Sequence, residues 1–162
     1  FSDLSIDDAL SFRPITLEDA PKCGEISYQA HKHRLNIEHY DVYSTPEKRA
    51  NFCIDLQSNK HGTIIENASL LMSVKDTPIG LVQTTRLESW DKVFGWIMDV
   101  SLLPSYQGIG YGKRLLQQTL QNLHNEGYEH AGLGVTLSNK GAKTLYEHLG
   151  FTDFEYFVEI IG

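Results

Sequence analysis

The stretch Phe94–Asn125, FGWIMDVSLLPSYQGIGYGKRLLQQTLQNLHN, carries the clearest structural signal in this chain. Its first part, Phe94–Leu103, is mostly apolar and contains aromatic and β-branched residues, and Pro104 ends it, which predicts a largely buried strand. From Lys113 onward leucines recur at helical spacing, and Gly127 follows the expected end of a helix. The stretch therefore predicts a buried strand, a glycine-rich turn and a helix in direct succession.

The turn between strand and helix, Gln107–Gly112, has glycine at three alternate positions. Glycine leaves the backbone with little side-chain cover, and a helix N-terminus offers unpaired N–H groups and the positive end of the helix dipole. Such a turn predicts an anion site, and a phosphate group is the ligand that we expect. A strand-to-helix turn without a ligand is the alternative.

The spacing of the glycines excludes two familiar phosphate-binding patterns. The P-loop has four residues between its first glycine and Gly-Lys, but only three separate Gly108 from Gly112, and Arg114 replaces the hydroxyl that would bind Mg²⁺. The dinucleotide pattern G-x-G-x-x-G fails because Lys113 stands where its third glycine belongs. What remains over Gln107–Gly112 is Gln-x-x-Gly-x-Gly.

This pattern resembles the coenzyme A signature of the GNAT superfamily of N-acetyltransferases, which is Arg or Gln, two residues, Gly, one residue, and Gly or Ala. A second segment, Ser138–Phe151, resembles the later part of the same family, an Asn-led helix that ends in Tyr, Leu, Gly and Phe. A short strand, His130–Leu137, is expected between the two motifs. The resemblance covers Phe94–Phe151 closely and the earlier chain only in its order of elements.

The remaining pattern predicts a mixed α/β fold in a single domain over residues 1–162. The earlier elements are a strand over Ser11–Ile15, a helix to about Ala30, a helix from Pro46 to about Leu56, and a hairpin of Ser69–Val74 with Ile79–Leu87. The resulting order is that of the GNAT fold, which has a central, mostly antiparallel mixed sheet that is splayed at the central strand, with helices on both faces. After the Gly-Phe pair the family usually has two more strands, whereas Thr152–Ile161 suffices for one. Truncation of the chain, a final strand supplied by a partner and omission of that strand all stay open.

The resemblance implies transfer of an acetyl group from acetyl-CoA to a primary amine of a small molecule, peptide or protein. It also implies a set of residues that bind acetyl-CoA. These are Val100, Ser101 and Leu102 along the pantetheine arm, Gln107, Gly108, Ile109, Gly110, Tyr111 and Gly112 around the pyrophosphate with Lys113 beside them, and Asn139 and Tyr146 further on. A plain helix cap is the alternative for Asn139, and a solvated lysine is the alternative for Lys113.

Two residues are the candidates for proton transfer. Tyr146 matches the tyrosine that commonly protonates the departing thiolate in the family, although a core aromatic is the alternative. Asp99, the only carboxylate of the central strand, is the candidate base, with a structural hydrogen bond as its alternative, because a carboxylate in an apolar strand is costly without partners. Strict alternation places residues 97, 99 and 101 on one face and 96, 98, 100 and 102 on the other. If Asp99 faces away from the acceptor, a residue of His31–Tyr43 could serve, or the amine arrives neutral.

Composition limits the partners. A net charge of −7 argues against a nucleic-acid partner and favours a cationic amine. No apolar run approaches the ~20 residues of a membrane span, and the two cysteines without C-x-x-C spacing suit reduced thiols in the cytoplasm. We expect no metal site. The family's habit of pairing through its last strands favours a homodimer. The rival functions are a non-catalytic CoA or acyl-CoA binding module on the same fold and an interaction domain whose turn binds nothing.

Overall fold

The computed structural model describes residues 10–32 and 45–133 of the chain. Their elements, in order, are β1 (Leu10–Pro14), the 3-10 helix η1 (Leu17–Asp19), α2 (Ala20–His31), α3 (Pro46–Gln57), the 3-10 helix η4 (Glu66–Ala68), β2 (Leu70–Val74), β3 (Thr77–Ser89), β4 (Lys92–Leu102), the 3-10 helix η5 (Pro104–Tyr106), α4 (Tyr111–Asn125) and β5 (His130–Leu133). Within these residues no helix combines the length and the apolar character that crossing a membrane requires.

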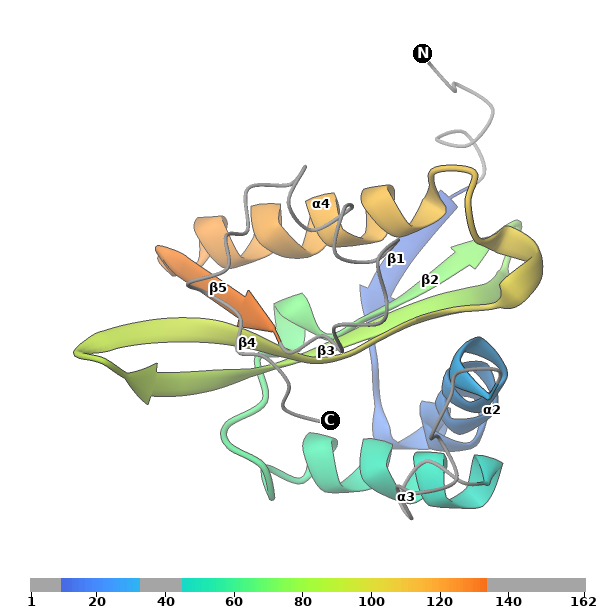
Figure 1. Cartoon of the computed structure of the whole chain (residues 1–162), viewed down its shortest axis with the longest axis horizontal. Helices are drawn as coiled ribbons and strands as arrows, with labels where there is room; N and C mark the ends of the chain where they lie inside the picture. The colour runs from blue at the N-terminus through green and yellow to red at the C-terminus, as the bar shows by residue number, and fades with distance from the viewer. Residues whose placement is uncertain (1–9, 33–44, 134–162) are drawn as a thin grey trace.

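The strands form one mixed sheet with helices on both faces, as the sequence predicts (Figure 1). Strand order follows the chain, β1-β2-β3-β4-β5; the first four strands pair antiparallel, and β5 runs parallel to β4. Helix α4 covers one face, and α2 and α3 lie together against the other (Figure 1). The described pairing of β4 with β5 runs from Phe94 and His130 to Ile97 and Leu133. The expected splay beyond that point stays a prediction.

Most element boundaries agree with the predicted ones. Helix α3 begins at Pro46, as expected, and Thr45 Oγ1 accepts a hydrogen bond from its first turn. Helix α4 begins at Tyr111, two residues before the predicted start, so Gly112 lies inside its first turn. The predicted later helix and the final strand, together with most of the predicted polar segment after α2, lie outside the described residues.

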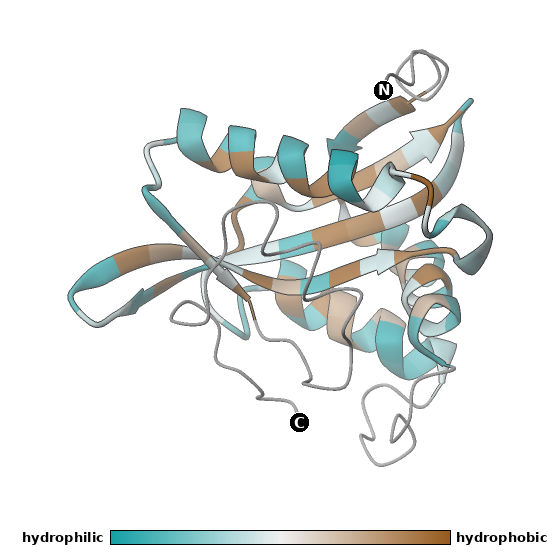
Figure 2. Cartoon of the chain, turned by 45° about the horizontal axis from the view of Figure 1, so that its top comes forward, coloured by the Kyte–Doolittle hydropathy of each residue, from teal (hydrophilic) through white to brown (hydrophobic). Residues whose placement is uncertain are grey.

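Two apolar layers sandwich the sheet, and Figure 2 shows hydrophobic residues alternating with polar ones along its strands. The layer beneath α4 consists of Leu70, Met72, Ile79, Val82, Ile97, Leu102, Leu115, Leu116 and Leu133. The layer beneath α2 and α3 consists of Ile15, Ala20, Cys23, Ile26, Cys53, Leu71 and Leu81. Neighbouring residues of one strand, such as Leu81 and Val82, thus belong to opposite layers, which is the period of two expected of a strand buried on both faces.

A β-bulge interrupts β4 at Met98. The register with β3 passes from Asp99 directly to Ile97, so Met98 has no partner across the pair. The extra residue reverses the alternation of faces beyond it: Ile97 and Val100 both pack into the layer beneath α4. The prediction that residues 97, 99 and 101 share a face is therefore wrong, because Asp99 and Ser101 point toward α2.

Candidate functional site

The glycine-rich turn exposes backbone at the start of α4. Gly108 and Gly110 have φ angles of +80° and +105°, a left-handed conformation that glycine adopts without strain. Among the described residues, no atom outside the two neighbours of Gly108 lies within 4 Å of the position that a Cβ of Gly108 would occupy. The first turn of α4 follows at once, and the first N–H groups of a helix have no partner within the helix. The turn therefore has the open backbone and the positive helix end that a phosphate group requires.

The side chain of Gln107 holds this turn against the end of β4. Its Nε2 donates a hydrogen bond to the Leu102 carbonyl at 2.8 Å. The rings of Tyr106 and Tyr111 meet edge to face at 5.5 Å and join η5 to the first turn of α4. Lys113 is exposed on α4, and Ile109 is 57% exposed at the top of the turn. The structure thus places the predicted pyrophosphate residues side by side; their contact with a ligand stays a prediction.

The backbone of β4 beyond the bulge presents alternate residues to its two sides. The Leu103 N–H donates to the Ile79 carbonyl of β3 at 2.9 Å. Because hydrogen-bonded and non-hydrogen-bonded pairs alternate between antiparallel strands, Val100 and Leu102 turn their backbone groups away from β3, and Ser101 turns its own toward it. Val100 and Leu102 therefore point their backbone groups to the side of β4 where the pantetheine arm is predicted. Ser101 pairs its backbone with β3 and points its side chain toward α2.

On the α2 side, β4 carries a buried polar cluster that we call the Asp99 cluster. Its members are Ser27 and His31 of α2, Arg49 of α3, and Asp99 and Ser101 of β4. Ser27 and His31 are four residues apart, so they share a face of α2. Arg49 lies on the buried face of α3, where the other buried residues are Cys53 and Leu56.

Asp99 is the acceptor at the centre of the cluster. Ser101 Oγ donates to its Oδ1 at 2.7 Å, and Ser27 Oγ donates to its Oδ2 at 2.9 Å. Arg49 Nη2 lies 3.3 and 3.4 Å from the two carboxylate oxygens, and Arg49 Nε donates to Ser27 Oγ at 2.7 Å. His31 Nε2 lies 3.0 Å from Ser101 Oγ and 3.8 Å from Asp99 Oδ1. One carboxylate thus joins two helices to the sheet.

The charges of the cluster keep Asp99 ionised. Burial raises the pKa of a carboxyl group, but here the Arg49 charge, the nearby His31 and the Ser101 hydrogen bond outweigh burial and hold the pKa of Asp99 below its usual range. Such a carboxylate is a weak proton acceptor at neutral pH. Of the two roles that the sequence left open for Asp99, this geometry favours the structural hydrogen bond, while direct acceptance of a proton stays an untested prediction.

Sequence reasoning missed Ser27 and Arg49, although their positions carried a signal. Arg49, Cys53 and Leu56 recur at spacings of four and three, which is the apolar face of an amphipathic helix. An arginine on that face requires an anionic partner, and Asp99 is the only carboxylate in the central strand. Two predicted site residues, Asn139 and Tyr146, lie outside the described residues.

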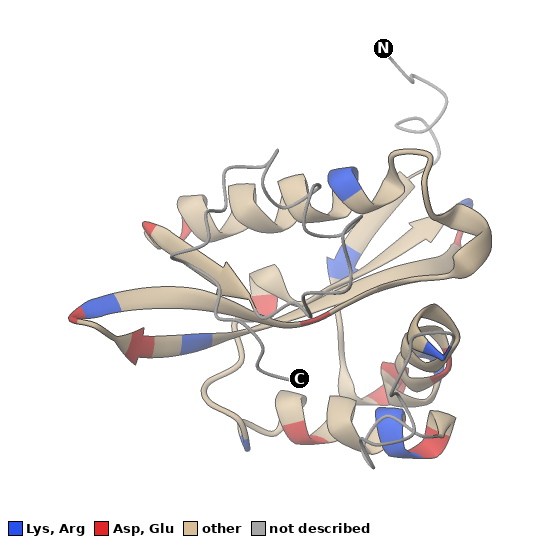
Figure 3. Cartoon of the chain, viewed as in Figure 1, with Lys and Arg blue, Asp and Glu red and all other residues tan. Residues whose placement is uncertain are grey.

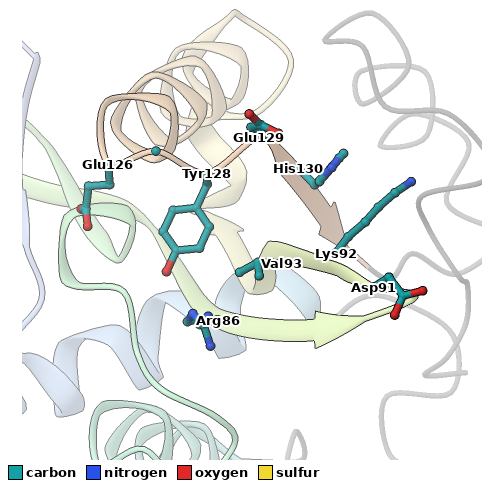
Figure 4. A pocket seen from close by; sticks show the side chains of 9 residues that line it. Arg86, Asp91, Lys92, Val93, Glu126, Tyr128, Glu129 and His130 are labelled. Carbon is teal, nitrogen blue, oxygen red and sulfur yellow. The ribbon is translucent and has the colours of Figure 1, made fainter.

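The described residues also form a cleft of about 500 Å³ far from these groups (Figure 4). It lies at the start of β4, between the β3–β4 hairpin and the end of α4, and its lining is Arg86, Asp91, Lys92, Val93, Glu126, Gly127, Tyr128, Glu129 and His130. The glycine turn and the Asp99 cluster lie toward the other end of β4. We therefore place the candidate site at the turn and the cluster rather than in this cleft.

Charge and metal-binding groups add little to this picture. Basic and acidic residues occur together on α2, on α3 and on the β3–β4 hairpin within the described part of the chain (Figure 3). Across residues 10–32 and 45–133, no group of three or more His, Cys, Asp or Glu side chains could hold a metal ion.

Comparisons with known proteins find acetyltransferases among the relatives of this chain. A relative in Haemophilus influenzae, the [ribosomal protein bS18]-alanine N-acetyltransferase, is 37% identical over 59 residues, which are 36% of this chain and 40% of that protein. The mycothiol acetyltransferase of Beutenbergia cavernae is 31% identical over 109 residues, 67% of this chain and 37% of that protein. The chain thus spans about two fifths of the length of these relatives.

Solved structures show the same fold. The PaiA N-acetyltransferase of Thermoplasma acidophilum, in complex with coenzyme A, superposes with a TM-score of 0.68 at 22% identity and covers 89% of this chain and 90% of its own. Arabidopsis thaliana Naa50, bound to a bisubstrate analogue, has a TM-score of 0.62 at 18% identity over 89% of this chain and 83% of its own. The family model for the acetyltransferase (GNAT) family matches residues 28–151. With the family's fold and its glycine-rich turn both present, the chain belongs to the GNAT family of acetyltransferases.

Proposed function

We propose that this protein transfers an acetyl group from acetyl-CoA to a primary amine. The observation that carries the proposal is the Gln107–Gly112 turn at the start of α4, with its left-handed glycines and the open space at Gly108. Membership of the GNAT family supports the choice of acetyl-CoA over other phosphate-bearing ligands.

The two ends of acetyl-CoA would meet different parts of this site. The helix end and the turn would bind the pyrophosphate, and the outward backbone groups of Val100 and Leu102 would pair with the pantetheine arm. A backbone N–H of this part of β4 would then face the thioester carbonyl as an oxyanion donor. In this proposal Asn139 contacts the pantetheine and Tyr146 protonates the departing thiolate.

A cationic amine suits this protein as acceptor. The whole chain has a net charge of −7, which attracts cations over distances near the Debye length. By their names, the relatives described above are an acetyltransferase for an alanine of ribosomal protein bS18 and a mycothiol acetyltransferase. We extend to this chain only their shared chemistry, acylation of an amine.

A non-catalytic CoA-binding protein is the second candidate. Its support is the Asp99 cluster, because a carboxylate paired with Arg49 and held at a lowered pKa is a poor base for an ammonium substrate. Turnover separates the two candidates: an enzyme releases free thiol from acetyl-CoA in the presence of an amine, and a binding protein does not.

The first test is a thermal-shift titration with acetyl-CoA and CoA, with desulfo-CoA and ATP as comparisons. Ligand at one hundred times its Kd stabilises the folded state by about 2.7 kcal/mol, so we expect a saturable rise in Tm of several degrees for both CoA species. Thiol release is then measured with a panel of primary amines, for the wild type and Tyr146→Phe. Absence of any Tm rise together with absence of thiol release would contradict the proposal.

Helix α4 offers a matched pair of variants for this titration. Gly110 precedes α4 with φ +105°, and Gly127 follows it with φ +94°. Alanine at either position introduces left-handed strain of roughly 1–2 kcal/mol, so both variants should lower the Tm without ligand. Only Gly110→Ala should also abolish the rise in Tm with CoA. Equal rises in the two variants would show that the glycine turn does not bind CoA.

Three broader features belong to the same proposal. One domain over residues 1–162 is supported by the single sheet and the two apolar layers that the described residues form. A cytoplasmic location is supported by the free thiols of Cys23 and Cys53. A homodimer is supported by the resemblance alone, and light scattering at several concentrations tests it: a constant monomer mass would remove it.

A further inference from the structure

The two cysteines of the chain lie in the apolar layer between the sheet and the α2–α3 pair. Cys23 belongs to α2 and Cys53 to α3, and thirty positions separate them in the sequence. Both are free thiols, with exposed fractions of only 1% and 2%. Two thiols from different helices therefore share one closed space.

The two helices approach one another beside these thiols more closely than a Cβ would allow. A Cβ added to Gly24, the residue after Cys23, would lie 2.6 Å from the Ala50 nitrogen and 2.7 Å from the Ala50 Cβ. Ala50 precedes Cys53 by three residues, so the two lie on neighbouring positions of one face of α3. This close approach thus lies within one helical turn of both sulfur atoms.

The faces of the two helices that carry the thiols also meet at a second point. Cys23 and Ser27 are four residues apart and share a face of α2, and Arg49 and Cys53 share a face of α3 in the same way. Arg49 Nε donates a hydrogen bond to Ser27 Oγ at 2.7 Å, so these faces are in contact. A hydrogen bond with Cys53, together with burial, raises the pKa of the Cys23 thiol, which requires the two sulfur atoms to lie side by side.

We propose that Cys23 and Cys53 are a site of reversible oxidation, at which a low-molecular-weight disulfide converts them into an internal disulfide that links α2 to α3. One protein thiolate attacks a sulfur of the small disulfide, which breaks its S–S bond, forms a mixed disulfide and releases one small thiol. The second protein thiolate attacks the protein sulfur of the mixed disulfide and releases the other small thiol. The protons of the two cysteines end on the two released thiols, so the protein is oxidised and the small disulfide is reduced.

Burial controls the rate of this exchange. The attacking species is a thiolate that the small disulfide can reach, and the closed layer withholds both sulfur atoms from it. The first step therefore proceeds when α2 or α3 opens locally. The second step follows as the layer closes, because closing brings Cys23 and Cys53 together and leaves the small thiol outside.

Oxidation removes one hydrogen bond but leaves its acceptor with a partner. Cys53 Sγ lies 3.5 Å from Gln83 Oε1, and the disulfide has no thiol hydrogen to donate there. Gln57 Nε2 donates to the same oxygen at 3.1 Å, and this hydrogen bond does not involve sulfur. The buried amide of Gln83 thus avoids the penalty of an unsatisfied acceptor, and the closed layer can keep the disulfide.

The test treats the wild-type protein with oxidised glutathione, both in native buffer and during refolding from urea. The disulfide closes a long loop in the unfolded chain, so we expect the oxidised protein to unfold roughly 5–15 °C above the reduced protein. Dithiothreitol should reverse this rise in Tm. Mass spectrometry should show the loss of two hydrogen atoms and one cross-linked pair of peptides that contains Cys23 and Cys53. In native buffer the reaction should accelerate when a little urea is added.

Cys53→Ala and Cys23→Ala are the controls, because a single cysteine cannot form an internal disulfide. The oxidant should not raise the Tm of either variant. In the wild type, glutathione bound to both cysteines, disulfide-linked dimers, or free thiols after refolding in the oxidant would each overturn the proposal. An internal disulfide that lowers the Tm would also overturn it, since the helices would then have to move to form the bond. The inference does not rest on the proposed acetyl transfer, and its test uses no acetyl-CoA.

Discussion

At the residue scale, single side chains hold together elements that are distant in sequence. Asp99 accepts hydrogen bonds from Ser27 of α2 and Ser101 of its own strand, and it pairs with Arg49 of α3. A buried charge is tolerated only with such partners, because burial without them penalises the charged form by several kcal/mol. The cluster therefore orients α2 and α3 on the sheet as well as His31.

Breaking the buried pair should be strongly destabilising. In Arg49→Met the carboxylate of Asp99 loses its cationic partner, and we expect the free energy of unfolding at pH 7 to fall by about 3–5 kcal/mol. The double variant Arg49→Met with Asp99→Leu should recover much of this loss, because it removes the unpaired charge. Urea unfolding measures both. Equal stability of the single and double variants would contradict the account of the pair.

Asp19 provides a test on the surface, where pH gives the sign. Its carboxylate accepts from Arg13 at 2.7 and 2.8 Å and from the Thr16 N–H at 2.8 Å, which completes the predicted capping box. The Arg13 hydrogen bonds lower the pKa of Asp19 from 3.8 to about 2. Ionised Asp19 therefore stabilises the folded state. This stabilisation is complete above the pKa that Asp19 has in the unfolded chain, and it is lost as the pH falls from about 4 to about 2.

Replacing Asp19 by Asn should therefore lower stability by about 1 kcal/mol at pH 7, and the difference should vanish near pH 2. Thermal unfolding at pH 7, 4 and 2 measures it. Glu25→Gln is the control, since Glu25 pairs with Lys22 and both side chains are about half exposed. A difference for Asp19→Asn that persists at low pH would exclude the ion pair as its source.

At the element scale, helices α2 and α3 pack closely because α2 has glycine at the crossing. A Cβ added to Gly24 would lie 2.6 Å from the Ala50 nitrogen and from the Pro46 oxygen, which are backbone atoms of α3. Backbone cannot rotate aside as a long side chain can. The two helices would have to move apart, and the distance between Ser27 and Arg49 would increase.

We expect Gly24→Ala to lower the free energy of unfolding by about 1–3 kcal/mol, because overpacking outweighs the gain in helix propensity of about 1 kcal/mol. Urea titration gives the value. Glu25→Ala, on the exposed side of the same turn, should change stability by no more than about 0.5 kcal/mol. A stabilised Gly24→Ala would show that the crossing can open freely.

At the scale of the whole molecule, the space between the sheet and the α2–α3 pair encloses both cysteines. Cys23 and Cys53 are buried, free thiols of the same apolar layer, and Cys53 Sγ lies 3.5 Å from Gln83 Oε1 of β3. A hydrogen bond with Cys53 and burial both raise the pKa of the Cys23 thiol. Such thiols are inert toward reagents that attack the thiolate.

Both thiols should therefore react with a disulfide reagent only when the layer opens. In native buffer we expect slow labelling that is limited by unfolding, and complete labelling above the urea transition. The rate of labelling is measured from the coloured thiolate that the disulfide reagent releases. It is compared with the unfolding transition followed by circular dichroism. Rapid reaction of one thiol under native conditions would place that cysteine outside the closed layer.

How far the sequence predicts the molecule depends on the range of the interaction. The element order, the proline start of α3, the mixed sheet and the glycine turn were all predictable, because hydrophobic period, proline geometry and glycine conformation act over a few residues. The bulge at Met98 was not, since an extra residue in β4 becomes visible only against the register of β3.

The sequence by itself determined the family, the sheet with helices on both faces and the glycine-rich turn before α4, because each rests on local spacing. Only the tertiary structure decided what Asp99 faces. The bulge turned it toward α2, and the packing of α3 supplied Arg49, fifty positions away in the chain. The pKa of Asp99 depends on such distant charges, and the packing of whole elements sets where those charges lie.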